Sequence, residues 1–158
     1  MSPRIPRVYA DTSVFGGILD EEFQEASRAF FDQVQGGRFR LVSSAIVEGE
    51  LREAPPGIRQ FYASILPITE LAEVTTDVIE LQQAYLAEGV LPPHSALDAL
   101  HVALAACTRT DIIVSWNFKH IVHFDRIRRF NAVNQLHGWD IVGIYSPKEV
   151  IDYEDKDV

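Results

Sequence analysis

Asp11, Glu50 and Asp98 are the acidic residues whose positions in the sequence could support chemistry. Carboxylates that gather in one pocket can hold a hard divalent cation through their oxygens. Asp11 follows an apolar run and precedes Thr12, Ser13 and a pair of glycines, which leaves room for a substrate phosphate at the end of a strand. A simpler role is also open, because Asp is a favoured N-cap and could begin the helix that follows.

Glu48 and Glu50 compete for the second acidic position, in the segment SSAIVEGEL. Successive helix residues are about 100° apart, so the apolar residues between 46 and 54 define one helix face, with Glu50 near its middle and Glu48 to one side. A glutamate on a buried face is costly unless a metal ion or another partner compensates it. Glu50 is therefore the candidate, and Glu48 is expected to face solvent.

The third acidic position, Asp98, has a competing structural explanation. Ser95 followed three residues later by Asp98 matches a capping box before an apolar helix. An acid in the first turn also suits the helix dipole. His101 lies one turn further along the same face, where a single histidine is more often a hydrogen-bonded or surface residue than a metal ligand.

A fourth polar segment, SWNFKHI, follows another apolar run and contains no acid. Ser115 and Asn117 could hold a water molecule or the substrate backbone, while Lys119 and His120 could contact phosphates. Alternatively, Asn117 forms a turn and Trp116 packs at the edge of the sheet.

Short apolar runs alternate with helical patterns, and this order predicts an α/β fold with a largely parallel sheet covered by helices. The expected strands are 8–10, 39–42, 112–114 and 141–145, and a further short strand could lie at 66–68. The expected helices are 22–34, 45–53, 76–87, 96–106 and 124–136. Functional residues in such sheets gather at the carboxyl ends of the strands.

The composition predicts one globular domain over residues 1–150, followed by an acidic, flexible tail at 151–158. The 158 residues are 47% hydrophobic and 23% charged, which excludes a disordered chain. A net charge of −9 argues against a protein that coats nucleic acid through a broad positive surface. The single Cys107 and the lack of any run of membrane-span length predict a cytoplasmic protein with no membrane association.

Four segments, VYADTSVFGG, SSAIVEGEL, LDALHVALAA and IIVSWNFKHI, resemble in order and spacing the motifs of PIN-domain nucleases. The resemblance covers nearly the whole chain and is closest to the VapC-type toxins of bacterial and archaeal toxin–antitoxin pairs. It implies a three-layer α/β/α fold with a central, mainly parallel sheet. It also implies that Asp11, Glu50 and Asp98 bind one or two Mg²⁺ or Mn²⁺ ions. The family often has a further acid near the fourth strand, where this chain has Ser115 and Asn117.

The resemblance implies a metal-dependent ribonuclease that hydrolyses single-stranded or loop RNA, as the toxin of a toxin–antitoxin pair. The expected partners are RNA, a cognate antitoxin protein and a second copy of the chain in a homodimer. The expected catalytic residues are Asp11, Glu50, Asp98 and Asn117, and the expected substrate contacts are Thr12, Ser13, Ser115, Lys119 and His120.

Two other functions stay open. A PIN-like fold that lacks the fourth acid could be a catalytically weak or inactive binding module that acts through a protein partner. A phosphotransferase with Asp11 as nucleophile is less favoured, because the Asp-x-Asp spacing of one large class is absent.

Overall fold

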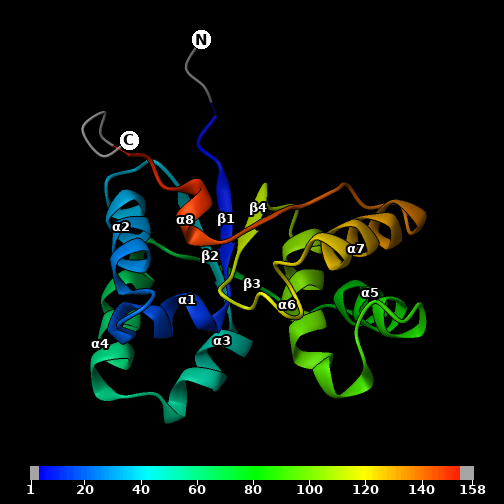
Figure 1. Cartoon of the computed structure of the whole chain (residues 1–158), viewed down its shortest axis with the longest axis horizontal. Helices are drawn as coiled ribbons and strands as arrows, with labels where there is room; N and C mark the ends of the chain where they lie inside the picture. Colours follow the sequence, from blue (N-terminus) through cyan, green and yellow to red (C-terminus); the bar gives the residue numbers. More distant parts are fainter. Residues whose placement is uncertain (1–3, 154–158) are drawn as a thin grey trace.

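A five-stranded sheet, in which every pair of neighbouring strands is parallel, forms the centre of the computed structural model (Figure 1). The structure describes residues 4–153. The strands are β1 (Arg7–Ala10), β2 (Arg40–Ser44), β3 (Glu70–Ala72), β4 (Ile112–Val114) and β5 (Gly143–Tyr145). Their order in the sheet is β3-β2-β1-β4-β5. The expected α/β fold with a parallel sheet is confirmed.

The strand order reverses at one place in the sheet. The chain moves outward from β1 through β2 to β3, and then returns to the other side of β1 with β4. Val8 of β1 lies opposite Leu41 of β2 and Ile112 of β4. Ligands of open parallel sheets bind where the strand order reverses, outside the carboxyl ends of the strands. This switch point lies between β1 and β4.

Helices cover both faces of the sheet, which gives three layers (Figure 1). One layer contains α1 (Thr12–Gly16), α2 (Gln24–Gln35), α4 (Pro56–Ile65) and α8 (Pro147–Val150). The other contains α5 (Thr76–Ala87), α6 (Ala96–Cys107) and α7 (Phe124–Leu136), and α3 (Ala45–Glu50) follows β2. Short 3₁₀ turns are η1 (Gly17–Leu19), η2 (Leu51–Glu53), η3 (Leu66–Ile68) and η4 (Pro93–Ser95). Within residues 4–153, every helix is too short or too polar to cross a bilayer.

Burial on both faces explains why the strands have continuous apolar sequences. Val8, Tyr9 and Ala10 of β1 are all completely buried, as expected for a parallel strand between two helical layers. Helix α6 is buried along most of its length and carries several alanines, such as Ala99 and Ala103. The small side chains let this helix pack closely against its neighbours, so the residues it presents at the sheet edge have a fixed place.

The predicted strand at 66–68 is wrong. Leu66–Ile68 forms the 3₁₀ turn η3, because Pro67 has a fixed φ and no amide N–H to donate to a sheet. The third strand, β3, begins only at Glu70. Helix α4 is not among the helices expected from the sequence, and two prolines, Pro55 and Pro56, stand at its start. Proline is also favoured in the first turn of a helix, and α4 begins in this way.

Only the beginning of the expected acidic tail lies within the described residues. Asp152 exchanges two hydrogen bonds with the side chain of Gln33 in α2: its amide donates to Oε1 at 2.9 Å, and its carbonyl accepts from Nε2 at 3.0 Å. Residues 154–158 of this expected tail lie outside the described residues.

Gly17 provides a test of the packing that joins α1 to the segment after β4. A methyl group on Gly17 would overlap Ser27 Oγ and lie 2.9 Å from Trp116 Nε1, whereas a methyl on Gly16 meets open space. Both glycines have helical backbone angles. We expect Gly17→Ala to lower the free energy of unfolding by about 1–3 kcal/mol through overpacking. Gly16→Ala should leave it unchanged or raise it by up to about 1 kcal/mol. Urea unfolding measures both, and equal effects would contradict this packing.

Candidate active site

The carboxyl ends of β1 and β4 bring Asp11 and Ser115 together at the switch point. The amide of Asp11 donates to the carbonyl of Val114 at 3.2 Å, which continues the pairing of the two strands by one residue. The Asp11 side chain is 4% exposed and the Ser115 side chain is fully buried. A residue 104 positions away in sequence thus becomes a direct neighbour of the first acid.

Three donors surround the Asp11 carboxylate. Oδ1 accepts from the amide of Ser13 at 3.1 Å and from its hydroxyl at 2.6 Å, and Oδ2 accepts from the Ser115 hydroxyl at 2.5 Å. Each hydroxyl oxygen accepts in turn from a backbone amide, Ser13 from Trp116 at 2.8 Å and Ser115 from Asn117 at 2.9 Å. These amides orient both hydroxyl protons toward Asp11. Asp11 is also the N-cap of α1, so the capping role is confirmed and coexists with a place in the pocket.

Glu50 lies at the rim of the pocket, at the end of α3. Its Oε1 accepts from the Thr12 hydroxyl at 2.9 Å and lies 2.6 Å from Nε2 of His101. The side chain is 34% exposed, so the expectation of a buried face is wrong for this residue. The reason is that α3 ends at Glu50 and the chain continues as the turn η2. Glu48 is exposed, as predicted.

Asp98 is held by a histidine from the segment after β4. Its Oδ2 lies 3.1 Å from Nδ1 of His120, and Ser95 Oγ lies 3.4 Å from the same nitrogen. The predicted capping box is wrong, because the Ser95 side chain makes no capping hydrogen bond. Ser95 ends the turn η4 with φ −103° and ψ 27°, whereas a capping side chain needs an extended backbone.

The segment after β4 forms a tight turn beside the acids. Asn117 Oδ1 accepts from the amide of His120 at 2.9 Å, so the alternative role of Asn117 as a turn residue is observed. Lys119 is exposed next to it. Trp116 is a packing residue, as the alternative predicted: it stacks on Phe23 with 4.3 Å between ring centroids and donates to Ser27 Oγ at 2.8 Å.

His101 connects the acids to the interior of the protein. It is 2% exposed, and its Nδ1 lies 2.7 Å from the hydroxyl oxygen of Tyr9, which lies 2.8 Å from Ser44 Oγ. The expectation that His101 is hydrogen-bonded is confirmed. Tyr9 and Ser44 were missed by the sequence reasoning. The signal was a tyrosine inside a buried strand, since a buried phenol hydroxyl usually finds a partner.

The environments of Asp11 and Glu50 shift their pKa values in opposite directions. Burial raises the pKa of Asp11, the nearby Asp98 adds to the rise, and His101 and the two serine hydroxyls oppose it only in part. Burial also raises the pKa of Glu50, but the contact with His101 and the Thr12 hydroxyl outweigh it and hold that pKa below its usual value. Burial raises the pKa of Tyr9 as well, so its hydroxyl stays protonated.

The donor chemistry of this edge suits a hard divalent cation. Within residues 4–153, no three His, Cys, Asp or Glu side chains form a group that could hold a metal ion. Glu50 and Asp98 each face an imidazole. Within residues 4–153, Glu50 Oε2 and Asp98 Oδ1 accept no hydrogen bond from the protein. These two oxygens and the buried Asp11 carboxylate are the ligand type that Mg²⁺ and Mn²⁺ prefer.

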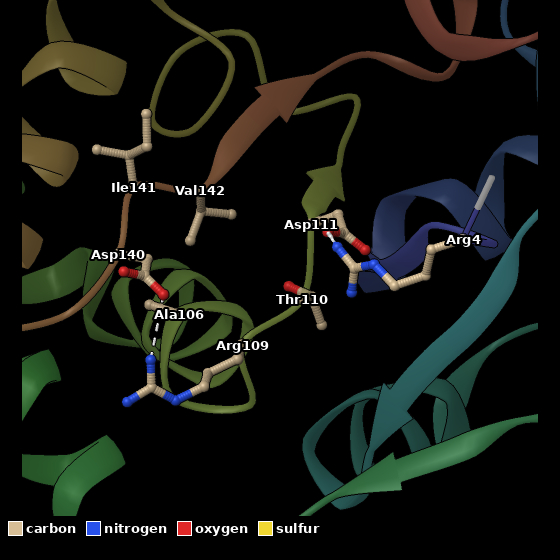
Figure 2. Close-up of a pocket in the computed structure, with 8 residues that line it drawn as sticks. All are labelled: Arg4, Ala106, Arg109, Thr110, Asp111, Asp140, Ile141 and Val142. Atoms are coloured by element: carbon tan, nitrogen blue, oxygen red, sulfur yellow. Dashed lines mark hydrogen bonds and ion pairs between the residues drawn. The ribbon is translucent and has the colours of Figure 1, made fainter. Parts of the chain in front are cut away.

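A separate hollow lies at the opposite edge of the sheet, before β4 and β5 (Figure 2). It has a volume of about 300 Å³. Its two guanidinium groups already have carboxylate partners: Arg4 pairs with Asp111, and Arg109 Nη1 lies 3.1 Å from Asp140 Oδ2. The hollow lies at the amino ends of the strands, where open parallel sheets do not bind ligands.

The fold of this chain is similar to the folds of two solved structures. The chain is similar to VapC20 of Mycobacterium tuberculosis, described as a sarcin-ricin loop cleaving toxin, with a TM-score of 0.55 and 15% identity over 72% of this chain and 92% of that one. It is also similar to FitAcB from Neisseria gonorrhoeae, with a TM-score of 0.54 and 14% identity over 90% of this chain and 99% of that one. No protein-family model and no curated protein sequence matches the chain. The likeness shows that the chain has a PIN-like fold, which these two proteins share.

Because the pKa of Asp11 is raised in the folded protein, the free energy of unfolding should depend on pH. Above its folded pKa the carboxylate is charged in both the folded and the unfolded protein, so the full free-energy cost of burying the charge is present. This cost disappears as the pH falls from the folded pKa toward the unfolded value of 3.8. The free energy of unfolding of Asp11→Asn, relative to wild type, should therefore rise with pH across this window. Urea unfolding in a chelating buffer between pH 4 and 8 measures it.

Asp140→Asn is the matched control for this experiment, because Asp140 is exposed and pairs with Arg109 at the surface. Its stability relative to wild type should show no comparable pH dependence. An Asp11→Asn difference that stays constant across the range would show that the buried charge has no such effect.

Proposed function

We propose that this protein is a divalent-cation-dependent endoribonuclease that hydrolyses single-stranded or loop RNA as the toxin of a toxin–antitoxin pair. The observation that carries the proposal is the meeting of three carboxylate-bearing elements at the switch point of a PIN-like sheet. Asp11 follows β1, Glu50 ends α3 and Asp98 lies in the first turn of α6.

Asp11, Glu50 and Asp98 would hold Mg²⁺ or Mn²⁺ through their oxygens. When bound, such a cation supplies positive charge beside the phosphate and makes a water molecule easier to deprotonate. One ion is better supported than two, because the segment after β4 contributes Ser115 and Asn117 in place of a fourth acid. Ser13 and Ser115 keep the Asp11 carboxylate in place, and their hydrogen bonds favour its ionised form.

The segment after β4 has groups suited to an RNA strand. His120 lies beside Asp98, and the exposed Lys119 precedes it in the same turn, so both could supply the donors that phosphate contacts require. Phe118 is 48% exposed and borders a hollow of about 690 Å³ that Trp116 and Phe23 also line. Unpaired bases stack on aromatic faces of this kind. A single strand or loop can present both its phosphate and its unstacked bases to such an edge, whereas a duplex cannot.

The likeness to VapC20 supports the choice of RNA, since that protein is described as cleaving the sarcin-ricin loop. The resemblance to VapC-type toxins supports two protein partners for this chain: an antitoxin that covers the acidic edge, and a second copy in a homodimer. The same likeness supports a cytoplasmic location, where such a toxin would meet its RNA.

A second candidate function is a catalytically weak or inactive PIN-like binding module that acts through a protein partner. The observation that favours it is that no three His, Cys, Asp or Glu side chains among residues 4–153 form a group that could hold a metal ion.

RNA cleavage distinguishes the two candidates. We expect the wild-type protein to cut a panel of structured RNAs in the presence of Mn²⁺ or Mg²⁺ and not in EDTA. Asp11→Asn should lower the rate by at least about 100-fold, because even the outer contacts of a metal site contribute about 10- to 100-fold. Asp140→Asn, which removes an acid at the opposite edge, should cut within about twofold of wild type. Failure of the wild type to cut any RNA with either ion would favour the binding module.

Cation binding should also be visible without RNA. A ligand that binds only the folded state stabilises it by about 2.7 kcal/mol at 100 times its dissociation constant. We therefore expect Mn²⁺ to raise the melting temperature of wild type and of Asp140→Asn, and to have little effect on Asp11→Asn. Differential scanning calorimetry of the three proteins measures this, and an equal shift in all three would place the ion elsewhere.

A further inference from the structure

His101 contacts residues from each element that carries an acid of the candidate site. It lies on α6, one turn after Asp98. Its Nε2 faces Glu50 at the end of α3, and its Nδ1 faces Tyr9 on β1, two residues before Asp11. We propose that Tyr9 and His101 are positioning residues for Glu50: a buried chain of hydrogen bonds from Ser44 through Tyr9 fixes the imidazole, and the imidazole fixes the carboxylate.

The distances describe a continuous chain. Ser44 Oγ and the Tyr9 hydroxyl are 2.8 Å apart, Tyr9 and Nδ1 of His101 are 2.7 Å apart, and Nε2 and Glu50 Oε1 are 2.6 Å apart. Ser44 and Tyr9 are completely buried and His101 is 2% exposed, so water does not compete for the inner links. Because both ring nitrogens are bonded, the imidazole cannot turn without breaking a buried hydrogen bond and leaving a buried polar group unpaired.

The direction of each hydrogen bond follows from the donors available. An ionised Glu50 only accepts, so Nε2 of His101 is the donor to it. The amide of Val47 donates to Ser44 Oγ at 3.4 Å, which leaves the Ser44 hydroxyl proton for the oxygen of Tyr9. The Tyr9 hydroxyl then donates to Nδ1. In this arrangement every buried polar group in the series of hydrogen bonds has a partner. This agrees with the absence of unpaired buried side-chain atoms among residues 4–153.

The series of hydrogen bonds begins and ends at the two ends of α3. Ser44 is the N-cap of this helix and Glu50 is its last residue. The N-cap is therefore linked to the acid six residues later by way of β1 and α6. A free glutamate side chain at this rim would populate several rotamers. With Oε1 held by His101 and Thr12, Oε2 stays unbonded within the described residues and is available as a ligand.

In this inference, the role of Glu50 as a cation ligand rests on the proposed function. The series of hydrogen bonds from Ser44 to Glu50 does not depend on that function. Tyr9→Phe removes one hydroxyl and keeps the buried ring, so it interrupts the chain with little change in packing. Tyr62→Phe is the matched control, since Tyr62 is also buried and its hydroxyl contacts a serine of β2, Ser43, at 3.1 Å, away from His101.

Two measurements on the full chain test the proposal. By ¹⁵N NMR of the metal-free wild type, His101 should carry its proton on Nε2, with Nδ1 as an acceptor, and the Nε2 proton should exchange slowly. Tyr9→Phe should speed this exchange, and Tyr62→Phe should not. By calorimetric titration with Mn²⁺, Tyr9→Phe should weaken binding by about 10- to 100-fold, and Tyr62→Phe by less than about twofold.

The outcomes separate this inference from the proposed function. A proton on Nδ1 alone in the wild type, or an unchanged His101 signal in Tyr9→Phe, would overturn the positioning chain whatever the protein does to RNA. Unchanged Mn²⁺ affinity in Tyr9→Phe would overturn its role toward Glu50. If the wild type neither binds Mn²⁺ nor cuts RNA, the proposed function and the role of Glu50 as a cation ligand fail together. The NMR result still decides whether the hydrogen bonds from Ser44 to Glu50 are formed.

Discussion

The buried carboxylate of Asp11 is the group on which the candidate site depends. An ionised side chain that is 4% exposed is costly unless hydrogen bonds replace the water it has lost. Ser13 supplies two of these bonds from the adjacent turn, and Ser115 supplies the third from the end of β4. The third donor is present only because the strand order returns β4 to the side of β1. The sheet topology and the local sequence therefore both contribute to keeping the acid in place.

The surroundings of two carboxylates at the same edge shift their pKa values in opposite directions. Burial dominates at Asp11 and raises its pKa, whereas the His101 contact and the Thr12 hydroxyl prevail at the half-exposed Glu50 and lower its pKa. Opposed shifts between neighbouring acids are typical of sites that do chemistry, although ion-pair networks of purely structural origin also produce them. A divalent cation beside Asp11 would oppose this rise in pKa, since a nearby positive charge favours the ionised carboxylate.

The sequence predicts those parts of the fold that depend on local patterns. The strands β1 and β4 and the helices α5 and α7 fall where the apolar runs and the helical periodicity place them. Local patterns mislead where one residue type serves two purposes. Pro55 and Pro56 cannot continue a helix from the preceding residues but do begin α4. Ser95 and Asp98 have the spacing of a capping box but contact His120 instead. The contacts of His101 were beyond prediction, because Tyr9 lies 92 residues away and meets it only in the finished sheet.

The distribution of the acids over the fold explains how one edge can hold several negative charges. Asp98 and His101 lie one turn apart on α6, the most buried helix, so a carboxylate and an imidazole are fixed relative to one another by the same rigid element. Each then pairs with a residue from elsewhere: Asp98 with His120 after β4, and His101 with Glu50 on α3. Two histidine–carboxylate pairs thus flank Asp11 and occupy one oxygen of each outer acid. Within residues 4–153, the second oxygen of each outer acid accepts no hydrogen bond, while the first is held by a histidine.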